Sequence, residues 1–167
     1  MRRLRMAAMA ASAIVSVPLA ADAVMVGPPP SNTGSGLDCS GAAASLGVIW
    51  PPNHTMVAIT IVGVTTDPSL PAPSVTITGI QQDEPVNTLG SGNTAPDGGG
   101  VGTSTAQVRA ERAGPGTGRL YFIYFSASDQ TGATCTGMVA PFVPHDQGQG
   151  FTPTDTGSRF DSTLIPQ

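Results

Sequence analysis

The chain has no lysine, and it has few charged or aromatic side chains for its length. Charged residues make up 11% and aromatic residues 5% of the 167 positions, whereas glycine occurs 21 times and proline 16 times. Stable helices need long-chain and charged residues and tolerate little glycine or proline in their interiors. The composition therefore excludes a helical bundle and predicts an all-β domain with long loops.

Long apolar runs are also scarce, and the only marked one lies at the start of the chain. Three arginines within the first five positions precede an apolar run from Met6 to Leu19, and the small residues Ala21-Asp22-Ala23 follow it. This order is typical of a secretory signal peptide, and the run is too short to span a bilayer. We expect residues 1–23 to be a cleaved signal peptide, the alternative being an uncleaved anchor.

Removal of this segment leaves 144 residues with four arginines and ten carboxylates, a net charge of −6. That length is enough for one domain. Nucleic acid and anionic lipid surfaces would repel such a protein. We expect it to be secreted, periplasmic or on the cell surface, without nucleic-acid binding or membrane insertion after signal removal. Its expected partner is an extracellular protein or a polysaccharide.

Cysteine is nearly absent as well, with Cys39 and Cys135 as the two examples. In an oxidising compartment an isolated pair most simply forms one disulfide, which here would join the first strand of the domain to the last. The alternative is two free thiols that serve redox or metal chemistry. That role needs a nearby histidine or a second cysteine at short spacing, and the sequence has neither.

The strongest strand signal is a hairpin between Arg119 and Pro144. Its first run places Tyr121, Ile123, Phe125 and Ala127 on one face, and the polar turn Asp-Gln-Thr-Gly separates it from a second apolar run. Alternation around a short glycine-containing turn is typical of a β-hairpin. We expect this face to form one side of the core.

Earlier strands are expected at Ser45–Trp50, Thr55–Val64, Ser74–Ile80 and Thr105–Arg112, where apolar and polar residues alternate or turn residues bound a short run. The longest irregular stretch, Gln81–Thr103, is rich in glycine, asparagine, aspartate and proline. A loop of this length in a compact domain is either functional or mobile.

About seven strands without an amphipathic helix predict an all-β, immunoglobulin-like antiparallel β-sandwich, with Tyr121 in the place of a tyrosine corner. We expect a signal peptide at 1–23, a Pro/Gly-rich linker at 24–37, the sandwich at 38–146 and a polar C-terminal tail at 147–167. The linker and the tail are expected to be largely unpacked.

Six short motifs follow one another along the chain: WPPNH from Trp50, DEPV from Asp83, APDG from Ala95, RAER from Arg109, GRLY from Gly118 and VPHD from Val143. With them the chain resembles a family of bacterial secreted or surface proteins that carry an immunoglobulin-like sandwich, often beside hyalin-repeat or polycystic-kidney-disease-type modules. The resemblance runs from Asp38 to about Gln147. It implies a fold and an extracellular setting, and it implies no activity.

Oxygen-bearing side chains concentrate in the long loop and the hairpin turn, and calcium prefers oxygen ligands. A calcium site there would use Asp83, Glu84, Asn87, Asn93, Asp97 and Asp129. Their spacing matches no EF-hand. The alternative is that these side chains cap turns and form salt bridges.

A second charged group surrounds one expected strand pair: Arg109, Glu111, Arg112 and Arg119. One interpretation is an ion-pair lattice with the carboxylates of the long loop, which would fix the loop to the sheet. The other is a bidentate arginine site for a carboxylate or a sulfate on a polysaccharide.

No catalytic signature is present: the sequence has no Gly-x-Ser-x-Gly, no His-Glu-x-x-His and no Walker loop. Its two histidines, His54 and His145, have no short metal-ligand spacing and are expected in hydrogen-bonded turns. We therefore expect a secreted or envelope-associated, non-catalytic binding or structural module without a cofactor other than calcium. The alternative is a small secreted hydrolase or carbohydrate-active accessory domain that uses the loop carboxylates.

Overall fold

The computed structural model describes residues 31–33, 36–87, 90–146 and 153–165, and within them it contains ten strands and no helix. The strands are β1 Ser31–Thr33, β2 Ala43–Ala44, β3 Met56–Val62, β4 Ser74–Gln82, β5 Gly98–Gly99, β6 Thr105–Arg109, β7 Gly118–Ser128, β8 Thr134–Val139, β9 Phe142–Pro144 and β10 Phe160–Asp161. The all-β prediction is confirmed. The expected signal peptide lies outside the described residues. In the part of the chain described here, no helix is long and apolar enough to cross a membrane.

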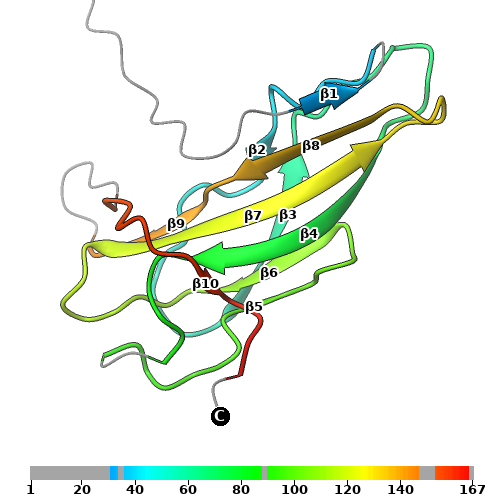
Figure 1. Cartoon of the computed structure of the whole chain (residues 1–167). Helices are drawn as coiled ribbons and strands as arrows, with labels where there is room; N and C mark the ends of the chain where they lie inside the picture. Colours follow the sequence, from blue (N-terminus) through cyan, green and yellow to red (C-terminus); the bar gives the residue numbers. More distant parts are fainter. Residues whose placement is uncertain (1–30, 34–35, 88–89, 147–152, 166–167) are drawn as a thin grey trace, which may run out of the picture.

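Two antiparallel sheets face each other (Figure 1). The first has the order β1-β8-β7-β4-β10, and β9 also pairs with β7; the second has the order β2-β3-β6-β5. The long strand β7 lies in the middle of the first sheet, between β4 and β8. This central position explains why β7 is buried along most of its length.

The core lies between the two sheets and follows the two-residue period of the strands. Phe125 of β7 and Ile77 of β4 are buried on one side, and Ile59 of β3 and Val108 of β6 are buried on the other. The predicted core face of the hairpin is therefore confirmed, and the alternation noted in the three long earlier strands matches their burial.

The C-terminal tail is packed, and the prediction that it would be unpacked is wrong for its described part. Strand β10 pairs with the end of β4, and Ser162 directly after it is fully buried. Ser162 donates its backbone N–H to Ile80 O at 3.0 Å. Its carbonyl accepts N–H groups from Asp97 at 2.9 Å and from Gly98 at 2.7 Å. The tail thus joins the two sheets along one side of the sandwich.

The opposite side is joined by the segment before Trp50. The N–H of Ile49 donates to Phe142 O at 2.8 Å, and the N–H of Phe142 donates to Gly47 O at 2.9 Å. The strand expected over Ser45–Trp50 is therefore reduced to a parallel bridge between Val48 and Phe142. Packing also reaches into the predicted linker, since β1 pairs with β8 and Leu37 is buried.

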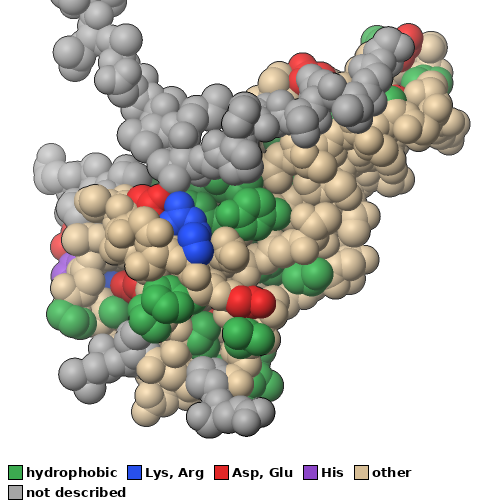
Figure 2. All heavy atoms as spheres, in the orientation of Figure 1, with side chains coloured by type: hydrophobic (Ala, Val, Ile, Leu, Met, Phe, Trp, Pro, Cys, Tyr) green, Lys and Arg blue, Asp and Glu red, His purple; other side chains and the backbone are tan. Residues whose placement is uncertain are grey.

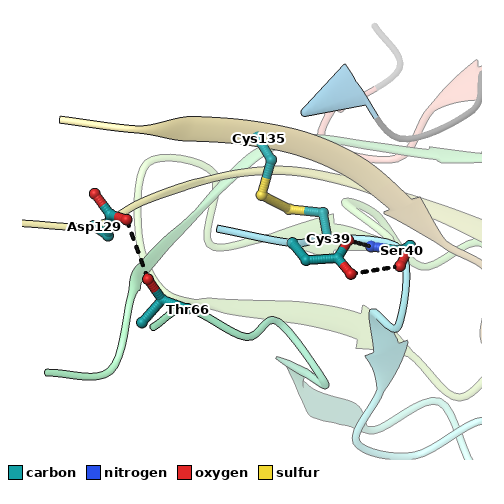
Figure 3. The surroundings of a disulfide bond; sticks show 6 residues. Cys39, Ser40, Thr66, Asp129 and Cys135 are labelled. Carbon is teal, nitrogen blue, oxygen red and sulfur yellow. Dashed lines mark hydrogen bonds between the residues drawn. A yellow bond between two sulfur atoms is a disulfide. The ribbon is translucent and has the colours of Figure 1, made fainter. Parts of the chain in front are cut away.

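The predicted disulfide between Cys39 and Cys135 is present, and it spans 96 positions of the sequence (Figure 3). Both cysteines are buried. Nearby, Thr66 Oγ1 donates to Asp129 Oδ2 at 3.1 Å, which ties the β3–β4 loop to the β7–β8 turn. The bridge connects the segment before β2 to β8. The expectation that it joins the first strand to the last is therefore wrong, because Cys39 lies outside the strands and β9 and β10 follow β8.

Candidate functional site

A buried cluster of charged side chains lies at the opposite end of β7 from the disulfide, with Arg119 at its centre. The Arg119 side chain is fully buried. Its Nη1 donates to Asp97 Oδ2 at 2.8 Å, and its Nε donates to Glu84 Oε2 at 2.9 Å. Its Nη2 lies 3.5 Å from Glu111 Oε1. Three carboxylates from three different segments thus meet one guanidinium, and we call this group the Arg119 network.

Two further side chains extend the Arg119 network toward the surface. Arg109 Nε lies 3.3 Å from Asp97 Oδ1, and the two terminal nitrogens of Arg109 donate to the carbonyls of His54 and Pro96. His54 Nδ1 lies 2.9 Å from Glu111 Oε2, which also accepts a hydrogen bond from the hydroxyl of Thr94. His54 is half-exposed, whereas Glu111 is buried.

Tyr121 completes the Arg119 network from the same strand. Its hydroxyl donates to the backbone carbonyl of Arg109 at 2.8 Å and accepts a hydrogen bond from Arg119 Nη1 at 3.2 Å. Burial raises the pKa of Tyr121 more than the adjacent guanidinium lowers it. Burial alone would lower the pKa of Arg119, but its interactions with Tyr121, Asp97 and Glu84 outweigh this and raise the pKa. Arg119 is therefore charged and Tyr121 neutral at physiological pH.

The end of β4 holds the long loop against the Arg119 network. Gln82 Nε2 donates to Asp97 Oδ2 and to the Glu84 carbonyl, both at 2.9 Å. Asp83 Oδ1 accepts the backbone N–H of Leu120 at 2.8 Å, while its other oxygen is buried without a hydrogen-bond partner. Burial raises the pKa of Asp83, and this outweighs the hydrogen bond from Leu120.

All six sequence motifs meet at this end of the sandwich. The VPHD segment takes part through the His145 carbonyl, which accepts Arg112 Nε at 3.0 Å. The other five segments supply His54, Glu84, Asp97, Arg109 with Glu111, and Arg119 with Tyr121. The ion pairs expected between the arginines and the loop carboxylates Glu84 and Asp97 are present. The irregular loop is fixed to the sheet by buried charge.

The residues considered for calcium do not converge. Glu84 and Asp97 bind Arg119, whereas Asp129 lies beyond the far end of β7, about 30 Å along the strand. There Asp129 accepts hydrogen bonds from Thr66 and Thr131. Asn87 is exposed in the loop after β4. Among the described residues no group of three or more His, Cys, Asp or Glu side chains is placed to hold a metal ion.

The arginines considered for anion binding are engaged within the protein. Arg119 has no exposed side-chain surface. Arg112 donates to the backbone carbonyls of Ala113, Gly114 and His145. Arg109 is bound to two backbone carbonyls and to Asp97. The three guanidinium groups therefore hold loops in place through hydrogen bonds and ion pairs.

Sequence reasoning missed a groove of about 490 Å³ on the first sheet. It runs between β4, the turn after β5 and the C-terminal tail, and we call it the tail groove. Its lining includes Gly79, Gln81, Gly98–Val101, Tyr124, Asp161 and Thr163. Tyr124 could have been assigned to the outer face from the two-residue alternation of its strand. Asp161 and Thr163 could not have been placed at this groove, because the sequence of the tail shows no alternation that predicts a strand.

Comparisons of the chain with protein-family models, with curated proteins and with solved structures gave no match.

Proposed function

We propose that this chain is an extracytoplasmic, immunoglobulin-like module that acts by binding or by architecture, in the envelope or outside the cell, and not by catalysis. The observation that carries the proposal is the Arg119 network. Acid–base or nucleophilic catalysis needs a reactive group within reach of a substrate. Here the carboxylates Glu84, Asp97 and Glu111 are buried and bound to Arg119.

The strand order supports the immunoglobulin-like part of the proposal. In a constant-type immunoglobulin domain one sheet has the order A-B-E-D and the other contains C, F and G. The order β2-β3-β6-β5 corresponds to the first, and β4, β7 and β8 correspond to the second. Tyr121 near the start of β7, with its hydroxyl on an upstream backbone carbonyl, agrees with a tyrosine corner. The cysteines differ, because they lie before β2 and in β8 instead of on the B and F strands.

The disulfide supports the location. A buried disulfide that spans most of a domain indicates a non-reducing environment. Together with the signal-like N-terminus and the resemblance to secreted bacterial proteins, this favours a secreted, periplasmic or cell-surface protein. Expression of the full chain in a bacterial host should yield an exported protein whose mass lacks residues 1–23.

Two assays distinguish catalysis from binding. The exported protein is tested for turnover of polysaccharides and peptides, and it is used as bait to capture components of solubilised envelope. We expect capture of an envelope component without turnover. Turnover that follows the folded protein through purification, and that is absent from the heat-unfolded protein, would contradict the proposal.

A further inference from the structure

We propose that the tail groove binds a neutral saccharide unit, which stacks on the ring of Tyr124 and hydrogen-bonds to Gln81 and Asp161. The inference deepens the proposed function, because it treats the chain as a binding module and names the ligand class. The groove is separate from the Arg119 network, and none of its lining residues belongs to that network.

The floor of the tail groove is an aromatic ring held in one orientation. Tyr124 on β7 lies opposite Gly79 on β4, where no side chain stands in its way. The ring extends across this position, and its hydroxyl donates to Gln81 Oε1 at 3.2 Å. Tyr124 is half-buried, so part of its ring faces the groove. A ring already fixed in place loses little entropy when a ligand stacks on it.

The walls supply polar groups without bulky side chains. On one side the chain from Gly98 to Val101 presents three consecutive glycines, so a ligand can approach the backbone closely. On the other side Asp161 Oδ1 accepts the N–H of Thr163 at 2.9 Å and its hydroxyl at 2.7 Å. This turn uses one carboxylate oxygen and orients the other.

These groups suit a sugar better than an anion or a purely apolar molecule. The lining contains no arginine or histidine, and its one charged residue is Asp161, so an anion would be repelled. An apolar ligand would leave the amide of Gln81 and the carboxylate of Asp161 without water or a partner. A pyranose has an apolar C–H face for the ring of Tyr124 and hydroxyls for the polar rim. The volume of about 490 Å³ falls within the range of small-ligand sites, roughly 300–1,000 Å³.

The tail groove exists because the tail is docked. Arg159 stacks over the ring of Phe122, with its Cζ 3.7 Å from the ring centroid. The same guanidinium forms two hydrogen bonds of 2.8 Å with Asp155. On the face shown in Figure 2, the largest basic patch lies beside an acidic one. Arg159 is thus a positioning residue that keeps Asp161 at the groove.

The test is a titration of the isotope-labelled, disulfide-bonded protein with cellotetraose, chitotetraose, xylotetraose and maltotetraose, followed by amide NMR. We expect saturable shifts of the amides of Gln81 and Gly98–Gly100 with at least one of the four. We expect Tyr124→Ala to weaken this binding at least about tenfold and Tyr124→Phe, which keeps the ring, to weaken it less. Because the ligand is neutral, binding should change little with salt.

Asp161→Asn has a matched control in Asp67→Asn. Asp67 forms the same turn with Ser69, but it lies outside the groove. We expect the first substitution to weaken binding several-fold and the second to leave it unchanged. This pair keeps the test valid if Tyr124→Ala does not fold.

Three outcomes would overturn the saccharide proposal: no saturable shift with any of the four sugars, shifts located away from the groove, or equal effects of Asp161→Asn and Asp67→Asn. A lysine-rich peptide that binds in place of the sugars, with strong salt dependence, would also overturn it. None of these results would refute a non-catalytic module. Cleavage of a tetrasaccharide during the titration would instead refute the proposed function.

Discussion

At the residue scale, Arg119 shows how a buried charge can determine the conformation of a loop. A guanidinium without exposed surface loses its hydration and needs close anionic partners in return. Asp97 lies in the long loop, Glu84 just after β4, and Glu111 just after β6. A loop conformation that withdraws one of these carboxylates leaves one nitrogen of the buried guanidinium without its anionic partner, so the Arg119 network favours one arrangement of the three segments.

Arg119→Met should therefore strongly destabilise the protein. It leaves Glu84, Asp97 and Glu111 buried without their common cation, and removal of one partner from a buried ion cluster typically costs about 3–5 kcal/mol. Chemical denaturation at neutral pH measures this change. Arg159→Met is the comparison: it removes the stacking on Phe122 and a partly exposed ion pair with Asp155 that should contribute about 1 kcal/mol or less, so it should lose less stability than Arg119→Met. Losses of equal size in the two variants would argue against the central role of Arg119.

The pKa of Asp83 is shifted in the opposite direction from the pKa values of Asp67, Asp129 and Asp155, which hydrogen bonds lower. Burial raises its pKa above the ordinary value of 3.8, and the charges of Glu84 and Asp155 add to the rise. The folded state therefore holds this proton at pH values where the unfolded chain releases it. Through Asp83, the free energy of unfolding increases as the pH falls from neutral toward 3.8. For Asp155, hydrogen bonds from Arg159 lower the pKa, so its stabilising contribution is lost as the pH falls below 3.8.

Asp83→Asn should accordingly be more stable than the native protein at neutral pH, because the desolvated charge is gone while the amide oxygen can still accept the N–H of Leu120. The advantage should shrink as the pH approaches about 4. Urea unfolding at a series of pH values measures it. Asp155→Asn is the comparison and should be less stable than the native protein at neutral pH. A stability difference for Asp83→Asn that does not vary with pH would contradict the assignment.

At the scale of elements, the two glycines of β5 differ in how closely other atoms pack against them. A Cβ atom at Gly98 would lie 2.7 Å from Ser162 Cβ, which is too close for packed carbon atoms. A Cβ atom at Gly99 would be 4.0 Å from the Cβ of Gln107, an ordinary contact. Gly98 is therefore the position at which the tail approaches the second sheet. There the carbonyl of Ser162 accepts the backbone N–H groups of Asp97 and Gly98.

Gly98→Ala should loosen the tail, and Gly99→Ala should not. We expect the first to lower the free energy of unfolding by about 1–3 kcal/mol, as overpacking does, and the second to change it by about 0.5 kcal/mol or less. Denaturation measures stability, and limited proteolysis after residue 152 measures release of the tail. If both variants keep the tail equally protected, close packing of Ser162 on Gly98 is not what holds it.

At the scale of the whole molecule, the sandwich is secured at both ends of β7 and along both sides. The disulfide holds one end, and the Arg119 network holds the other. The tail joins the sheets along β4, and the segment before Trp50 joins them along β9. A domain with so few aromatic residues has a modest core, so these additional connections compensate for limited apolar burial.

Loss of the disulfide should thus be costly. For a closed loop of 96 residues the chain-entropy estimate is about 4–5 kcal/mol at most. The double variant Cys39→Ala, Cys135→Ala should show a corresponding drop in the denaturant midpoint. Reductant should lower the midpoint of the native protein and leave that of the double variant unchanged. In the native protein both thiols should resist alkylation without reduction. Free alkylation of either cysteine would contradict the disulfide.

Much of the fold could be predicted because its information is local. Alternation of apolar and polar residues identified β3, β4, β6 and the β7–β8 hairpin, since side chains of a strand point to opposite faces in turn. Strands of two or three residues, such as β5 and β10, have too few positions to show a period. The tail was therefore predicted as unpacked, although Ser162 is fully buried.

The candidate site divides in the same way. Composition and motif order predicted which residue types would form ion pairs, namely the arginines near β6 and β7 with the carboxylates of the long loop. The sequence by itself determined the class of the fold, its inward faces and the pairing of its two cysteines. Only the tertiary structure decided that Arg119 is buried against three carboxylates, that Asp129 is far from them, and that the tail forms a groove with Tyr124. Those relations join residues distant along the chain, and distance in space depends on how sheets pack, which no local pattern encodes.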